Sequence, residues 1–147
     1  MEYNLYSLTV LFHSTVRYFV LIAMLVSLYR AARGWFGGAA FEKTDEKLSV
    51  WLLIMAHTQL ILGFLLYYIS PRVTFDMKDN ESRYWSVEHI TLMLVAIVLI
   101  TLSRITSKKT VDAAGKHKRI FLYNAFALLL ILMAIQMSGR GFFSLPM

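Results

Sequence analysis

Ionisable side chains inside long apolar runs are the residues of this sequence that could do chemistry. They are His13 and Arg17 in the first run, His57 in the second, and Glu88 and His89 at the start of the third. In a bilayer such a group is costly unless it faces a partner, water or a cofactor. The sequence therefore predicts a site at these five residues, and their three imidazoles are the candidate metal ligands.

Other kinds of site are excluded by what the sequence lacks. There is no cysteine, so thiolate metal sites, iron–sulfur clusters, disulfides and covalently attached haem are ruled out. No phosphate-binding glycine loop, GxSxG elbow or H-E-x-x-H motif occurs. A di-iron centre would need several carboxylates, and Glu88 is the only acid within the apolar runs. Three histidines alone could still hold zinc or copper.

The elements that must position these residues are membrane helices. The chain of 147 residues is 58% hydrophobic and only 16% charged, which is far from soluble composition. A hydrocarbon core of about 30 Å needs about 20 apolar residues per helix. Four runs of this kind cover residues 5–29, 48–70, 84–103 and 120–138. We therefore expect an all-α integral membrane protein, with residues 1–147 forming a single transmembrane domain that is a four-helix up-and-down bundle.

The distribution of Lys and Arg predicts how the bundle is oriented. Ten of the fifteen basic residues lie in the first and third connections between the runs: Arg30, Arg33, Lys43, Lys47, Arg104, Lys108, Lys109, Lys116, Lys118 and Arg119. The positive-inside rule places these connections in the cytoplasm and both termini in the periplasm. We expect a multi-pass protein of the bacterial inner (cytoplasmic) membrane, whose net charge of +6 reflects topology and no nucleic-acid partner.

Two smaller expectations concern the basic connections. Gly34, Gly37 and Gly38 predict a flexible first connection. His117 lies in the basic run 116–119. We expect its side chain to be solvated and to face the lipid headgroups.

Depth along the helices favours one pair of histidines. At a rise of 1.5 Å per residue, His13 lies about 10 Å inside the outer end of its run and His89 about 6 Å inside, whereas His57 lies about 20 Å inside. The first and third helices are diagonal in an up-and-down bundle. Two inward imidazoles at similar depth suit a porphyrin iron, with bonds of about 2 Å. The sequence thus predicts haem ligation by His13 and His89.

The other candidates keep several roles open. His57 could replace either partner if the helix boundaries are wrong by a turn, ligate a second haem, or bind a quinone carbonyl. Arg17, one turn from His13, is placed to pair with a haem propionate or another anion. Glu88 could pair with Arg17 or orient an imidazole. All three histidines could also be structural hydrogen-bond donors between helices.

The chain resembles a family of small bacterial four-helix membrane proteins of the cytochrome b type. The resemblance is carried by His13-Ser-Thr-Val-Arg17, His57-Thr-Gln-Leu-Ile-Leu-Gly63, Glu88-His89 and a basic stretch before the last run. A looser similarity is to one half of haem A synthase, although the second ligand expected on the fourth helix is absent here. The resemblance implies haem b held by inward histidines, carried onto His13, His57 and His89.

These observations predict a function in electron transfer. We expect a b-type cytochrome that binds one haem b or two by bis-histidine ligation and takes electrons from quinol, acting as an electron-transfer protein rather than a stand-alone enzyme. One alternative is a non-catalytic interaction subunit of a larger respiratory or transport complex, or of a homo-oligomer. Another is an assembly factor that handles haem or copper.

Overall fold

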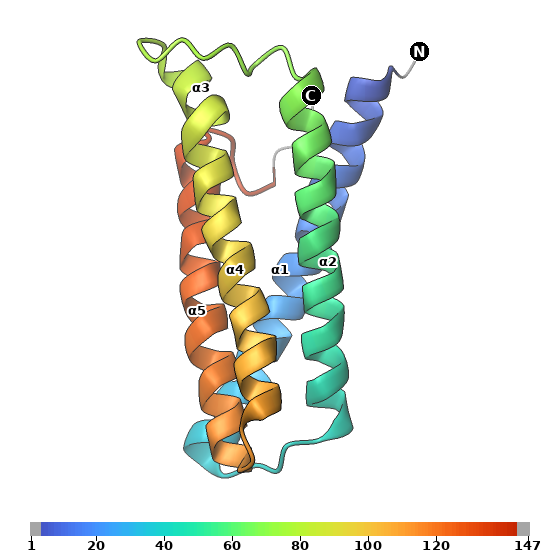
Figure 1. The fold of residues 1–147 in the computed structure, drawn as a ribbon, viewed down its shortest axis with the longest axis vertical. Coiled ribbons are helices and arrows are strands. Elements are labelled where there is room, and N and C mark those ends of the chain that lie inside the picture. Colours follow the sequence, from blue (N-terminus) through green and yellow to red (C-terminus); the bar gives the residue numbers. More distant parts are fainter. Residues whose placement is uncertain (1–3, 144–147) are drawn as a thin grey trace.

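The structure, a computed structural model, describes residues 4–143 as a bundle of long helices (Figure 1). The long helices are α1 (Leu5–Gly37), α2 (Lys43–Ile69), α4 (His89–Lys109) and α5 (Ala113–Met137). A short helix α3 (Asn80–Arg83) and a π-helical turn η1 (Tyr84–Glu88) run directly into α4. Four helical segments are long and apolar enough to cross a membrane. The predicted all-helical protein with four membrane-length helices is confirmed.

The helices extend beyond the apolar runs that predicted them. The first continues to residue 37 instead of 29, the second begins at 43 instead of 48, the third continues to 109 instead of 103, and the fourth begins at 113 instead of 120. An apolar run measures the thickness of the hydrocarbon core, whereas a helix ends where its backbone groups are capped.

Side-chain and glycine caps set several of these boundaries. The carboxylate of Asp112 accepts the backbone N–H of Gly115 at the start of α5, at 2.6 Å. Glu42 and Asp45 form a reciprocal capping box at the start of α2. At the end of α1, Gly38 adopts a φ of 70° and donates its N–H to the carbonyl of Arg33, a glycine C-cap.

The helices are arranged so that the first and third membrane segments are diagonal. Helix α1 packs against α2 and α5, and α4 packs against the same two helices. Helix α1 begins and α5 ends at one end of the bundle, beside the connection 70–79 (Figure 1). We call this the cavity end. The opposite end, with the connections 38–42 and 110–112, is called the basic end.

His117 at the basic end contradicts its predicted position. Its side chain is only 2% exposed and packs against Phe41, with the ring centroids 5.1 Å apart. Its Nε2 lies 3.2 Å from the carbonyl oxygen of Ala40. A Cβ atom on Gly34 would lie 1.9 Å from Cδ2 of His117. The expectation of a solvated, headgroup-facing His117 was wrong, because the glycine leaves room for the imidazole inside the bundle.

The close approach of Gly34 to His117 also contradicts the expectation that the glycines make the first connection flexible. Gly34 and Gly37 both lie within α1, and Gly34 is buried. It serves close packing between α1 and α5. The connection itself is further tied down by Arg30, whose Nε donates to Asp45 at 2.6 Å.

Candidate functional site

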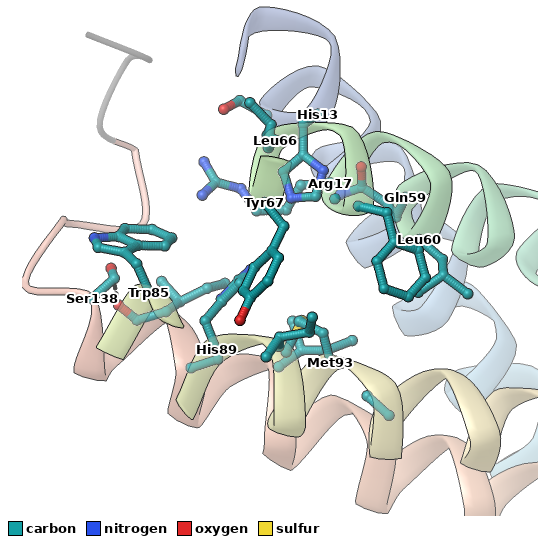
Figure 2. Close-up of a pocket in the computed structure, with 18 of the residues that line it drawn as sticks. His13, Arg17, Gln59, Leu60, Leu66, Tyr67, Trp85, His89, Met93 and Ser138 are labelled. Carbon is teal, nitrogen blue, oxygen red and sulfur yellow. Dashed lines mark hydrogen bonds between the residues drawn. The ribbon is translucent and has the colours of Figure 1, made fainter. Parts of the chain in front are cut away.

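A cavity lies in the core of the bundle, towards the end where α1 begins and α5 ends. Its empty volume is about 1590 Å³, part of which is open to the surroundings. Side chains from α1, α2, η1, α4 and α5 line it, together with residues of the connection 70–79 and of the segment that follows α5. Most of the lining is apolar. Its polar members include His13, Ser14, Arg17, Gln59, Tyr67, Arg72, Tyr84, His89, Ser138 and Arg140. Figure 2 labels six of them, namely His13, Arg17, Gln59, Tyr67, His89 and Ser138.

The structure brings two of the three candidate histidines together across this cavity. His13 extends from α1 and His89 from α4, and Figure 2 shows both among the lining residues. Their ring centroids are 6.5 Å apart with an interplanar angle of 65°. Two metal–nitrogen bonds of about 2 Å, with the half-widths of the two rings added, separate ring centres by about 6 Å. The spacing is therefore that of two imidazoles on opposite sides of one metal ion.

His89 is held by a neighbour from the π-helical turn. Its Nδ1 lies 3.2 Å from the hydroxyl oxygen of Tyr84, and that hydroxyl donates to the carbonyl of Ala134 on α5 at 2.5 Å. Trp85 covers the same imidazole, with the ring centroids 5.2 Å apart. Arg140 in turn lies over the Trp85 ring, 5.4 Å from its centroid. The orientation of His89 is thus determined by two residues of η1, one of which is bonded to α5.

Three buried polar atoms around the cavity have no hydrogen-bond partner among residues 4–143. They are Nδ1 of His13, Nε of Arg17 and Oε1 of Gln59. A buried polar atom without a partner costs about 1 to 3 kcal/mol, so native proteins rarely leave several together. Because all three residues line one cavity, they indicate a polar group of a ligand, or water, inside it.

Arg17 lines the cavity without pairing with a carboxylate of the described residues. Its Nη2 donates to the hydroxyl of Tyr18 at 3.1 Å, and the Tyr18 hydroxyl donates to the carbonyl of Phe142 at 3.0 Å. Within the described part of the chain, no ion pair involves Arg17. A cation in an apolar cavity is a favourable partner for an anion.

Glu88 does not reach the cavity. Its carboxylate pairs with Nε of Arg83 at 2.8 Å, and it is absent from the lining. The interaction considered between Glu88 and Arg17 is therefore not formed. Glu88 remains adjacent to His89 in sequence, but the hydrogen bond to that imidazole comes from Tyr84.

His57 is separated from the histidine pair. Its side chain is exposed on the outer surface of α2 and does not line the cavity, whereas its neighbour Ala56 does. Its Nδ1 lies 2.9 Å from the carbonyl oxygen of Leu53. No group of three or more His, Asp or Glu side chains that could share a metal occurs within residues 4–143. A zinc or copper site made by all three intramembrane histidines is therefore not formed.

Two functional candidates escaped sequence reasoning. Gln59 lies one turn before Gly63, and that spacing is equally typical of a close helix contact, although a glutamine in an apolar run is itself a signal. Tyr84 was not among the predicted site residues. Its contact with His89 depends on the π-helical turn, which no residue pattern indicates.

Comparisons with protein-family models, with curated proteins and with solved structures found no match to this chain.

Proposed function

We propose that this protein is a b-type cytochrome of a bacterial inner membrane, similar to the small four-helix cytochrome b-like family, in which His13 and His89 ligate one haem b. The observation that carries the proposal is the pair of imidazoles 6.5 Å apart on diagonal helices. His57 lies outside the cavity, which favours one haem over two.

The donors and the lining suit this cofactor. The imidazoles of His13 and His89 would hold the haem iron, and the mostly apolar lining suits a porphyrin face. Arg17, whose Nε has no partner within residues 4–143, supplies a cation for a propionate. When bound, the haem supplies one-electron chemistry, and two protein ligands leave no open coordination position, so electron transfer is favoured over oxygen chemistry.

Topology and partner belong to the same proposal. The basic end faces the cytoplasm, because exposed Lys and Arg side chains gather there. The cavity end and both termini then face the periplasm. The exposed apolar side chains of the helices suit contact with lipid, and we propose a lipid-soluble quinol as the electron donor.

The deciding experiment measures haem directly. We would purify the full chain in detergent from cells supplied with haem, record the reduced-minus-oxidised spectrum, and quantify pyridine haemochrome against protein. We expect sharp b-type bands and one haem per chain. His13→Ala and His89→Ala should each abolish the low-spin spectrum.

His57→Ala is the matched control, because it removes an imidazole from a membrane-length helix at a position outside the cavity. It should leave the haem content unchanged. Retention of the low-spin spectrum in both cavity variants, or its loss in His57→Ala alone, would overturn the assignment of the ligands. A flat spectrum in the wild-type protein would overturn the cytochrome.

One observation favours a second function, that of a non-catalytic subunit in a larger membrane complex. His57 and Thr58 place polar side chains on an exposed face of α2, where a neighbouring protein would satisfy the imidazole better than lipid. This alternative predicts that the purified protein carries no haem and that His57→Leu weakens its association with that complex.

A further inference from the structure

We infer that Tyr84 is a positioning residue for His89: it keeps the proton of that imidazole on Nδ1 and so presents Nε2 as the ligating nitrogen. The inference rests on the proposed function for its consequence in the haem-bound protein. Its structural part concerns only Tyr84, His89 and Ala134.

The π-helical turn is what lets the two side chains meet. Tyr84 and His89 are five residues apart, and in a regular α-helix such residues point about 140° away from each other. In the wider turn η1, the backbone N–H of His89 bonds to the carbonyl of Tyr84, and residues five apart lie on nearly the same side. The hydroxyl oxygen therefore comes within 3.2 Å of Nδ1.

The direction of the hydrogen bonds follows from the third partner. A backbone carbonyl can only accept, so the 2.5 Å contact with Ala134 uses the hydroxyl proton of Tyr84. The lone pairs of the phenolic oxygen remain for Nδ1. The His89 nitrogen must then be the donor, and a neutral imidazole that carries its proton on Nδ1 has a free lone pair on Nε2.

The surroundings make this chain of hydrogen bonds well defined. Tyr84 is only 5% exposed, and its ring packs beside the imidazole with the centroids 5.7 Å apart. The acceptor lies near the end of α5, so the chain links η1, α4 and α5. His13 differs, because its buried Nδ1 has no partner among the residues that the structure describes.

The arrangement also sets the redox behaviour of a bound metal. A hydrogen bond accepted from Nδ1–H makes the ligating nitrogen a better electron donor. A stronger donor stabilises the oxidised iron, which lowers the midpoint potential. Tyr84 therefore holds the potential below the value that an unsupported His89 would give.

The first test needs no haem. We would label histidine with ¹⁵N in the full chain, purify it from haem-deficient cells, and read the tautomer of His89 from its two nitrogen shifts, assigned with His89→Gln. We expect the Nδ1–H form in the wild type and a shift towards the Nε2–H form in Tyr84→Phe. A wild-type protein in the Nε2–H form would overturn the inference, even if the variant fails to fold.

Tyr67→Phe is the matched control. Tyr67 lines the same cavity. Its replacement by Phe removes an equivalent hydrogen bond, the one from the Tyr67 hydroxyl to the carbonyl of Ser86 at 2.8 Å. The Tyr67 hydroxyl is bonded to neither histidine. Its His89 shifts should match the wild type. If Tyr67→Phe moves the tautomer as far as Tyr84→Phe does, the specific role of Tyr84 is refuted.

The second test is a redox titration of the haem-loaded proteins. Tyr84→Phe should have a higher midpoint potential than the wild type, and Tyr68→Phe, at an exposed tyrosine that does not line the cavity, should not. If Tyr84→Phe binds haem with an unchanged His89 tautomer and an unchanged midpoint potential, the positioning role of Tyr84 is overturned and the proposed function stands. The expected tautomers in a protein that never binds haem support the positioning role and overturn the proposed function.

Discussion

Each end of the bundle places a histidine beside a glycine of a neighbouring helix, with opposite results. At the basic end, a Cβ on Gly34 would lie 1.9 Å from His117, so the imidazole fills the space that the glycine leaves. At the cavity end, a Cβ on Gly63 would lie 3.5 Å from Cε1 of His13, an ordinary contact. His117 is thus a packing element, whereas His13 borders free space.

Charged groups differ between the two ends in the same way. Asp45 at the basic end is buried, yet it is paired with Arg30. The unpartnered buried atoms towards that end belong to neutral side chains, Ser49 and Asn124. At the cavity end, the unpartnered atoms include those of ionisable His13 and Arg17. Ionisable groups left without partners in a cavity mark a ligand site, whereas burial alone does not.

The largest expected effect separates a histidine that lines the cavity from one that is packed between helices. His89→Ala should remove the low-spin haem spectrum entirely, because a proposed haem ligand is lost. His117→Ala should retain it but lower the midpoint of thermal unfolding, because it leaves a hole between α1 and α5. Visible spectra and melting curves of both detergent-solubilised variants test this. Haem loss in His117→Ala, with the protein still folded, would contradict the comparison.

The glycines beside the two histidines should respond in opposite directions. Gly34→Ala forces a methyl group into the His117 ring and should destabilise the protein by about 1 to 3 kcal/mol. In Gly63→Ala the new methyl group makes only an ordinary contact. Because alanine has a better helix propensity than glycine, this variant should be more stable than the wild type by up to about 1 kcal/mol. Equilibrium unfolding in mixed micelles measures both. Equal losses of stability would show that the cavity end is packed as tightly as the basic end.

An ion pair at each end provides the next comparison. Asp45→Asn breaks a buried charged hydrogen bond and should cost about 1.5 to 3 kcal/mol. Its counterpart at the cavity end is Glu81→Gln, in the more exposed pair with Arg72, which should cost about 0 to 1 kcal/mol. The same unfolding assay compares them. A larger loss from Glu81→Gln would reverse the ranking of the two ends.

The smallest expected effect concerns charge at the cavity. Arg17→Leu removes a cation beside the proposed haem. Because a nearby positive charge destabilises the oxidised form of the iron, its removal should lower the midpoint potential. Arg33→Leu, at an exposed position near the basic end, is the control and should leave it unchanged. Redox titration measures both. An unchanged potential in Arg17→Leu would assign Arg17 a structural role through Tyr18.

Sequence reasoning reached part of this site because depth and spacing follow from helix geometry. His13 and His89 were placed at similar depths on diagonal helices, and their rings are 6.5 Å apart. His57 could not be assigned, because a small rotation of α2 decides whether a residue faces the cavity, like Ala56, or the outer surface. Glu88 was associated with the site by adjacency, but Arg83 holds its carboxylate.

The sequence by itself determined the number of membrane-length helices and the segregation of basic residues to two connections. These properties depend on local composition, which the cost of placing polar groups in hydrocarbon constrains strongly. Only the tertiary structure decided that His117 is packed against Gly34, that His57 is exposed, and that Tyr84 reaches His89. Each of these depends on helix rotation and a local π-helical turn, where packing between distant segments outweighs any pattern along the chain.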